Sequence, residues 1–485
     1  MSFFKGRRMN RPEISVNTLE LLVKAPTGIA GLDELTRGGL PAGRPTLVCG
    51  GPGCGKTVLA MEFLVRGAED FEEPGLFVSF EEKPEQLLAN FRSMGFDLAG
   101  LIGKKRLKIS YVELSAEEIT EAGAFSLDAL LIRLEHAIAE VGAKRVALDS
   151  VETIFSVLSP TVALRGEVAR LFHWLREKGM TAIVTAERGS AELTRHGFEE
   201  YLSDCVVLLD HRVEGQISRR RLRIVKFRGS AHAADECPFL IGETGFSVLP
   251  ISSLNLDHSA SRERVSTGVP DLDIMLGAEG YFKGTTVLVT GTAGTGKSSL
   301  AAAFAVAACE RGERCLYFSF EESASQLTRN MQSLGIDLSP WLSQGTLTVR
   351  AFRPSFRGLE EHLLSITRET ARLEPSCVVI DPITNFITVG EADEVRSMVT
   401  RIMDLLKHRG ATLLMTALMR NETETHVSSL VDTWIGLDLE SQGHTFRRAI
   451  HVVKSRGMGH SQETRELVMS SQGLSLRSLN GDKAS

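Results

Sequence analysis

Two segments of the chain match the phosphate-binding pattern G-x-x-x-x-G-K-[ST]. Each follows a short apolar run and opens a stretch with helical character, which is the strand, loop and helix context that the pattern requires. Glycines let backbone N–H groups close around phosphate oxygens, and the following helix directs its positive end at them. The residues expected to contact a nucleotide are Gly50, Gly51, Gly53, Cys54, Gly55, Lys56, Thr57 and Val58 in the first segment, and Gly291, Thr292, Gly294, Thr295, Gly296, Lys297, Ser298 and Ser299 in the second.

The last two residues of each pattern have separate expected roles. Lys56 and Lys297 are expected to reach the β and γ phosphates. The hydroxyls of Thr57 and Ser298 are expected to take one position on Mg²⁺, a small hard cation that usually keeps waters and bridges to phosphate. The alternative of two plain glycine-rich turns is less favoured, because two matches occur in the required context.

An aspartate ends a continuous apolar strand in each half of the chain, at Asp149 and at Asp381. Ligands of open α/β sheets bind at such carboxyl ends, and an acid there supports Mg²⁺ through water in phosphate-loop ATPases. In isolation each aspartate could equally be a helix cap or a turn residue. Their place downstream of a phosphate loop, twice, favours the magnesium role.

Two adjacent glutamates end the second predicted strand of both halves, Glu81 with Glu82 and Glu321 with Glu322. Side chains alternate along an extended strand, so one member of each pair can face the γ phosphate while the other turns away. Attack on that phosphate needs an acceptor for the proton of water or of a hydroxyl. We expect one glutamate of each pair to be that base, and the pattern does not choose between them.

A Lys-x-Arg pair lies near the end of a late strand in each half, Lys226 with Arg228 and Lys454 with Arg456. Such a pair can discourage pairing at a sheet edge. It can equally neutralise the γ phosphate of a neighbouring subunit, as arginine fingers do. Both interpretations stay open from the residues alone.

The halves repeat one another beyond these motifs. FVSFEE recurs as YFSFEE, MGFDL as LGIDL, and VKFRG as VKSRG. Apolar β-branched runs alternate with helical periods, which predicts an α/β fold with a mostly parallel sheet flanked by helices. We therefore expect tandem copies of one phosphate-loop domain, with the first at residues 1–250, a polar linker at 251–265 and the second at 266–485.

Composition narrows the class of protein further. The net charge of −6 argues against a surface built for nucleic acid, and the only dense basic run, RRRLR at 219–223, is interpreted as a solvated hairpin or subunit contact. The seven cysteines lack CxxC spacing, which favours reduced thiols and a cytoplasmic location. No apolar run is long enough for a membrane span, so no membrane role is expected.

These motifs, together with SDCVVLLD in the first copy and THVSSLVDTWIGL in the second, resemble the KaiC family of duplicated RecA-like ATPases of the circadian clock. The resemblance extends from about Pro26 to Leu476. It implies a double-ring homohexamer with ATP and Mg²⁺ between subunits, with the Lys-x-Arg pairs reaching the neighbour's nucleotide. It also implies a first ring that hydrolyses ATP and a second ring that autophosphorylates and autodephosphorylates Ser/Thr.

The two copies differ where the resemblance places the phosphorylated residues. Ser428 and Ser429 of the second copy stand where the first has Glu200 and Tyr201, and Thr423 matches a nearby third hydroxyl. The resemblance also implies a KaiB-like partner, whereas a KaiA-type stimulator is not favoured because only a short polar segment follows Leu476. Two other functions stay open: an ATP-gated signalling scaffold without phosphotransfer, and a RecA-like DNA-dependent ATPase.

Overall fold

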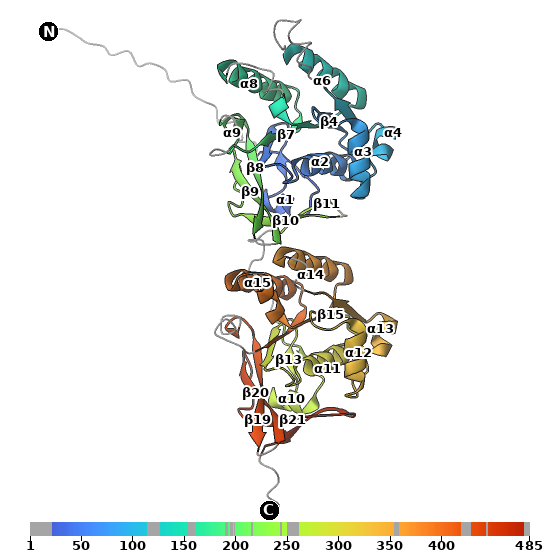
Figure 1. Cartoon of the computed structure of the whole chain (residues 1–485), viewed down its shortest axis with the longest axis vertical. Coiled ribbons are helices and arrows are strands. Elements are labelled where there is room, and N and C mark those ends of the chain that lie inside the picture. Colours follow the sequence, from blue (N-terminus) through green and yellow to red (C-terminus); the bar gives the residue numbers. More distant parts are fainter. Residues whose placement is uncertain are drawn as a thin grey trace, which may run out of the picture. The chain divides into compact units, whose positions relative to one another are not determined.

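The computed structural model divides into two compact units, Met1–His211 with Arg220–Pro250, and Arg212–Arg219 with Ile251–Ser485. The structure describes residues 22–113, 127–153, 161–189, 193–194, 197, 199–214, 217–242, 245–249, 261–353, 358–418, 428–442 and 445–479. Figure 1 colours the first unit from blue to green and the second from yellow to red. Residues 251–260 of the predicted linker lie outside the described residues.

The first unit is built on a nine-stranded sheet. Its order is β11 (Gly245–Val248), β10 (Cys237–Gly242), β9 (Ile217–Phe227), β8 (Cys205–Glu214), β3 (Pro45–Gly50), β7 (Thr181–Glu187), β6 (Arg145–Asp149), β4 (Gly75–Ser79) and β5 (Leu107–Tyr111). The strands from β8 to β5 run parallel, whereas β9, β10 and β11 pair antiparallel. A separate two-stranded sheet pairs β1 (Lys24–Ala25) with β2 (Leu40–Pro41).

Helices cover both faces of this sheet because its central strands are apolar on both sides. Val48 and Phe77 face one cluster, which includes α1 (Leu32–Leu35), α2 (Lys56–Asp70), α3 (Pro84–Ser93) and α4 (Leu98–Gly103). Leu47 and Leu76, one residue earlier on the same strands, face α6 (Leu127–Val141) and α8 (Thr161–Glu177). The short helix α9 (Glu199–Leu202) precedes β8.

The second unit repeats this plan. Its sheet has the order β16 (Leu347–Ala351), β15 (Cys315–Ser319), β17 (Cys377–Asp381), β18 (Thr412–Leu418), β14 (Thr286–Gly291), β19 (Thr433–Gln442), β20 (Thr445–Ser455), β21 (Arg465–Ser470) and β22 (Gly473–Ser478). The strands from β16 to β19 are parallel, and the last three are antiparallel additions. A two-stranded sheet pairs β12 (Arg264–Val265) with β13 (Tyr281–Phe282).

One face of the second sheet packs on α10 (Pro270–Met275), α11 (Lys297–Glu310) and α12 (Ala324–Gln332), with α13 (Ser339–Gln344) beside β16. On the other face α14 (Leu359–Leu373) packs against α15 (Ala392–His408), which contacts β18 and the 3₁₀ helix η2 (Ile383–Thr388). Two mostly parallel sheets flanked by helices confirm the predicted fold class.

Two further observations bear on the sequence analysis. No helix among the described residues is long and apolar enough to cross a bilayer. All seven cysteines are free and buried, and burial raises the pKa of the Cys49, Cys205 and Cys377 thiols to about 12. These thiols therefore behave as small core residues, because burial outweighs the nearby cations that would favour the thiolate.

Arg145, at the start of β6, is fully buried and holds three segments of the first unit together. Its guanidinium donates to Glu73 Oε2 at 2.6 Å, to the Phe63 carbonyl at 3.1 Å and to the Pro26 carbonyl at 2.9 Å. It also lies 4.6 Å from the centre of the Phe63 ring. Cys377 begins the corresponding strand of the second unit, so this tie belongs to the first unit alone.

We expect Arg145→Ala to destabilise the first unit by about 3–5 kcal/mol, because it leaves a carboxylate and two buried carbonyls without their donor. The midpoint of the lower thermal transition should fall by at least about 6 °C. Differential scanning calorimetry measures it. Arg372→Ala, which removes a surface ion pair with Glu369, is the control, and it should shift the midpoint by less than about 2 °C.

Candidate functional site

The first phosphate loop joins β3 to α2 at the carboxyl edge of the sheet. Gly55 caps α2 with φ 103°, a left-handed conformation that favours glycine. A Cβ at Gly55 would lie 2.4 Å from the Ile241 side chain, whereas a Cβ at Gly51 or Gly53 would meet no atom within 4 Å. The loop is therefore closed on its sheet side and open on the side where phosphate would lie.

The second loop has the same construction between β14 and α11. Gly296 caps α11 with φ 102°, and a Cβ at Gly294 would meet nothing within 4 Å. Thr295, at the position of Cys54, donates its hydroxyl to the Thr292 carbonyl at 2.9 Å. The side chains of both Cys54 and Thr295 are buried, so only their backbone N–H groups are suited to a phosphate.

The lysine of each loop lies across the loop's opening. Lys56 Nζ is 2.8 Å from the Gly50 carbonyl and 3.0 Å from the Gly51 carbonyl. Lys297 Nζ is 2.9 Å from the Gly291 carbonyl and 2.7 Å from the Thr292 carbonyl. Both ammonium groups are therefore held at the mouth of the cradle, as the motif predicts for a phosphate ligand.

In the first unit the structure brings the two predicted metal residues together. Thr57 Oγ1 donates to Asp149 Oδ2 at 2.7 Å, and the Thr185 hydroxyl on β7 donates to Asp149 Oδ1. Burial raises the pKa of the Asp149 carboxyl, and these two hydroxyls oppose the shift. A hydroxyl held against a carboxylate beside the phosphate loop is suited to Mg²⁺ with one direct and one water-mediated contact.

The second unit does not form the matching pair. Asp381 Oδ2 accepts from the Tyr317 hydroxyl at 2.7 Å, Oδ1 accepts from Thr416, and no hydrogen bond joins Asp381 to Ser298 in the described part of the unit. Phe77 occupies the position of Tyr317 in the first unit and cannot donate such a bond. The two acids therefore share a place in the fold but differ in the hydroxyl that holds them.

The glutamate pair of the first unit differs from expectation in its local structure. β4 ends at Ser79, and Glu81 and Glu82 lie in a turn closed by the Ser79 hydroxyl, which donates to the Glu82 carbonyl at 2.6 Å. The two side chains nevertheless have separate partners. Glu81 Oε1 accepts from Ser150 at 2.7 Å, and Glu82 Oε2 accepts from Asn90 on α3 at 3.2 Å.

The turn is repeated in the second unit, where Ser319 donates to the Glu322 carbonyl at 2.7 Å. Glu322 Oε1 accepts from Asn330 on α12 at 2.9 Å, and Glu322 Oε2 is buried without a hydrogen-bond partner. Pro382 stands where Ser150 stands in the first unit, so Glu321 has no corresponding hydroxyl there. The peptide bonds Asp149–Ser150 and Asp381–Pro382 are both cis.

Each Lys-x-Arg pair holds the backbone of a segment that leads into the preceding strand. The pair at the end of β9 holds the segment before β8, and the pair at the end of β20 holds the segment before β19. In the first unit Arg228 donates to the Tyr201 carbonyl at 2.9 Å, and in the second Arg456 donates to the Ser429 carbonyl at 2.6 Å. Tyr201 and Ser429 therefore occupy equivalent places, as the aligned sequences predict. Ser429 is exposed and Ser428 is buried, while Thr423 lies outside the described residues.

Partial burial, together with the neighbouring arginine of each pair, lowers the pKa of Lys226 and of Lys454. Lys226 Nζ lies 2.8 Å from the Glu200 carbonyl, and Lys454 Nζ lies 3.4 Å from the Ser429 carbonyl. Both lysines therefore support the same segment as their arginines.

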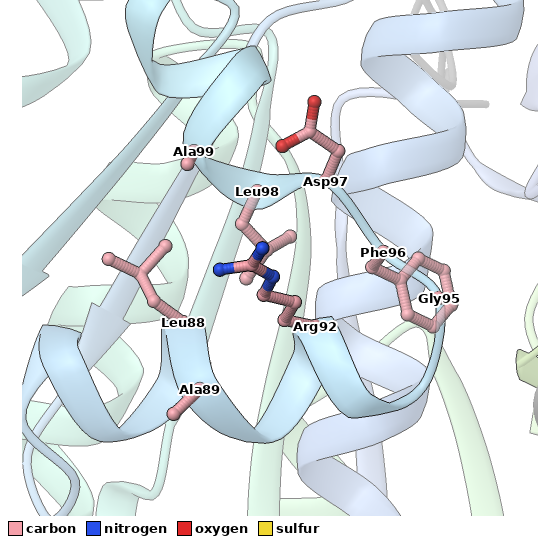
Figure 2. Close-up of a pocket in the computed structure, with 8 residues that line it drawn as sticks. All are labelled: Leu88, Ala89, Arg92, Gly95, Phe96, Asp97, Leu98 and Ala99. Atoms are coloured by element: carbon pink, nitrogen blue, oxygen red, sulfur yellow. The ribbon is translucent and has the colours of Figure 1, made fainter.

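An open hollow of about 690 Å³ lies between α3 and the segment leading to α4. Figure 2 shows the residues that line it. Leu88 and Leu98 form much of its apolar wall, and Arg92 and Asp97 supply its charged groups. None of the predicted site residues lines it. The hollow is therefore separate from the phosphate loop and its acids.

Metal binding at either site would depend on the nucleotide. Among the described residues, no group of three or more His, Cys, Asp or Glu side chains could hold a metal. Mg²⁺ commonly takes only one or two protein ligands and completes its shell with phosphate oxygens and water. One hydroxyl, one nearby carboxylate and an open glycine loop fit that requirement in the first unit.

Sequence reasoning missed three side chains that shape these sites. Asn90 and Asn330 fix the second glutamate of each pair, and their equal spacing from Glu82 and Glu322 was a signal that could have found them. Tyr317 approaches Asp381 only because β15 and β17 are neighbours, with Ser319 opposite Asp381. No local sequence pattern predicts the contact between Tyr317 and Asp381.

Comparisons with known proteins agree over nearly the whole chain. The family model described as "ATPase: KaiC" matches twice, at residues 25–253 and 265–480. The circadian clock protein KaiC2 of Synechocystis sp. is 48% identical over 462 residues, which cover 94% of this chain and 81% of that protein. The circadian clock oscillator protein KaiC of Parathermosynechococcus lividus is 38% identical over 470 residues, covering 95% and 87%. That of Synechococcus elongatus is 37% identical over 462 residues, covering 94% and 89%.

We expect the wild-type chain to bind two nucleotides, and Lys56→Ala and Lys297→Ala each to retain one. Loss of two charge-assisted hydrogen bonds costs about 3 kcal/mol, so the affected site should weaken roughly 100-fold. Equilibrium dialysis with labelled ATP measures the stoichiometry. Lys83→Ala, at an exposed lysine next to Glu82, should leave it at two; a second nucleotide retained by both loop variants would contradict the assignment.

Proposed function

The chain belongs to the KaiC family of ATPases, and on this basis we propose that it binds ATP with Mg²⁺ at both phosphate loops. The first unit hydrolyses ATP. The second unit transfers the γ-phosphoryl group to its own Ser428 and Ser429, with Thr423 as a further acceptor, and also removes those phosphates. Bound Mg²⁺ would supply charge stabilisation at the phosphate oxygens.

The proposed residue roles follow from the contacts at each loop. The backbone N–H groups of the loops, with Lys56 and Lys297, hold the phosphates. Thr57 with Asp149, and Ser298 with Asp381, serve the metal. The proposed proton acceptors are Glu81 and Glu82 in the first unit, and Glu321 and Glu322 in the second. The unpartnered, buried Glu322 Oε2 favours Glu322 as the acceptor for a serine proton.

The observation that supports phosphotransfer is the equivalence of Ser429 and Tyr201. The same Lys-x-Arg contact holds both residues, so the second unit presents aliphatic hydroxyls at a place where the first presents none. A phosphate there would add about −1.5 to −2 charges beside Lys454 and Arg456, which could hold it. We expect Ser429 to accept before Ser428, because Ser429 is exposed and Ser428 is 6% exposed.

The assembly we propose is a homohexamer in which nucleotides lie between subunits. Arg228 supports this role because about half of its side chain is exposed (52%) and so remains available to a second copy of the chain. In that assembly Lys226, Arg228, Lys454 and Arg456 neutralise the γ phosphate of the adjoining subunit. A KaiB-like partner, a cytoplasmic location and a part in timing or stress signalling complete the proposal.

Incubation with Mg-ATP should add up to two phosphates to the wild-type chain, measured by intact-mass spectrometry with site mapping. Ser429→Ala should reduce early incorporation most, and the double variant with Ser428→Ala should take up less than about a tenth of the wild-type phosphate. Tyr201→Ser in the first unit is the matched control and should gain none. An unmodified wild-type chain that still hydrolyses ATP would leave the scaffold as the better description.

Arg456→Ala should slow phosphate incorporation at least about 100-fold if its guanidinium stabilises the transferring group. Arg477→Ala, at an exposed arginine on β22, should have no effect. Mixing the Arg456→Ala chain with the Glu322→Gln chain tests whether two subunits share one site. The first chain still supplies Glu322, and the second still supplies Arg456. Recovery of activity in the mixture is expected; a mixture as inactive as its two components would refute the shared site.

A further inference from the structure

A buried carboxylate without an assigned role lies beside the first site. Glu152 is the third residue after the end of β6 and is 8% exposed. Its Oε1 accepts from the Glu187 backbone N–H at the end of β7, whereas its Oε2 is buried with no hydrogen-bond partner. An unsatisfied buried oxygen costs free energy, so its retention beside a reaction centre calls for a functional explanation.

The Ser150 hydroxyl links this carboxylate to the predicted base. Ser150 is 5% exposed and donates to Glu81 Oε1 at 2.7 Å. The interaction of the same hydroxyl with the Glu152 carboxylate lowers the pKa of Glu152. A hydroxyl has one proton to donate and lone pairs to accept another, so Ser150 can pass a proton from one carboxylate to the other.

Burial and a neighbouring negative charge raise the pKa of Glu152 toward physiological pH. Burial raises the pKa of Glu152 to about 7, and the negative charge of Glu187 on β7 adds to that rise, while the Glu187 N–H and the Ser150 hydroxyl oppose it. The neighbouring Asp149 carboxyl is in turn influenced by the charges of Glu81 and Lys56. A carboxylate of this kind can take up and release a proton at physiological pH.

We propose that Glu81, Ser150 and Glu152 form a proton relay that removes the proton of the attacking water from the first site. The relay rests on the proposed ATP hydrolysis in the first unit and adds a path that the phosphate-loop motif does not contain. Glu152 is the terminal acceptor and acts through Ser150, without contact with the nucleotide.

Each step conserves protons and bonds. As the water oxygen bonds to the γ phosphorus and the bond from phosphorus to the bridging oxygen of ADP breaks, one water proton passes to Glu81. That proton moves to Ser150 Oγ while the original Ser150 proton moves to the Glu152 carboxylate. Ser150 is restored, Glu81 is again ionised, and Glu152 holds the proton until it is released to solvent.

The second unit keeps Glu321 in place of Glu81 but lacks the other two members of this path. Pro382 replaces Ser150 and has no hydroxyl. Thr384 replaces Glu152, and its hydroxyl oxygen accepts the Leu418 N–H at 3.3 Å, which is the bond that Glu152 Oε1 makes to Glu187. Thr384 therefore makes the same backbone contact as Glu152 but cannot take up a proton. The second unit thus keeps the structural contact without the proton acceptor.

The test is the pH dependence of ATP hydrolysis by the full chain carrying Lys297→Ala, so that only the first site turns over. With an acceptor of pKa about 7 that must be ionised, the rate should rise about tenfold from pH 6 to pH 8. Glu152→Gln keeps an oxygen for the Glu187 N–H but takes up no proton. The hydrolysis rate of this variant should change less than twofold from pH 6 to pH 8. At pH 8 it should lie about fivefold to tenfold below the rate of the parent.

Thr384→Ala, at the equivalent position of the second unit, is the control and should keep the parent profile. Ser150→Ala interrupts the path while leaving Glu152, so the same flattening is expected; it decides the matter if Glu152→Gln fails to bind nucleotide. A Glu152→Gln profile as steep as that of the parent overturns the relay alone. No hydrolysis by the wild-type chain at any pH overturns both the relay and the proposed function.

Discussion

The left-handed glycine that starts the helix after each phosphate loop is the constraint on which the rest of the structure depends. Gly55 and Gly296 adopt φ values of 103° and 102°, which a side chain would strain, and packing against Ile241 leaves no room for a Cβ at Gly55. This conformation turns the chain so that the first helical N–H groups point into an open loop. A negatively charged ligand then lies at the positive end of the helix, with the lysine across its mouth.

The parallel sheet brings the reacting groups to that same edge. β3 and β6 are separated by β7, yet their carboxyl ends are close enough for Thr57 to donate to Asp149. Ser79 lies opposite Asp149, so the turn that carries the glutamates begins beside the acid that would serve the metal. Because parallel strands all end at one edge, residues far apart in the chain meet there without any long-range motif.

The two units share this sheet and loop framework but differ in side chains around the loops. Phe77 and Tyr317 are at equivalent positions, so only the acid of the second unit has a phenol donor. Ser150 and Pro382 are also equivalent, so only the first site has a hydroxyl beside its first glutamate. Tyr201 corresponds to Ser429 in the segment that the basic pairs hold. These exchanges leave the cradles alike and alter the groups around them, which is a physical basis for the proposed division of labour between hydrolysis and phosphotransfer.

Local chemistry made much of this accessible from the sequence: the loops, the lysines, the strand-end acids and the duplicated α/β plan all follow from short patterns whose geometry is set by neighbours in the chain. The expectation that the glutamates end a strand was wrong in detail, because the Ser79 hydroxyl closes a turn that periodicity does not reveal. The partners of the acids depended on tertiary structure alone. Tyr317 with Asp381, Ser150 with Glu81 and Glu152 with Glu187 are joined by strand order and register, which arise when the whole sheet folds and which no single segment specifies.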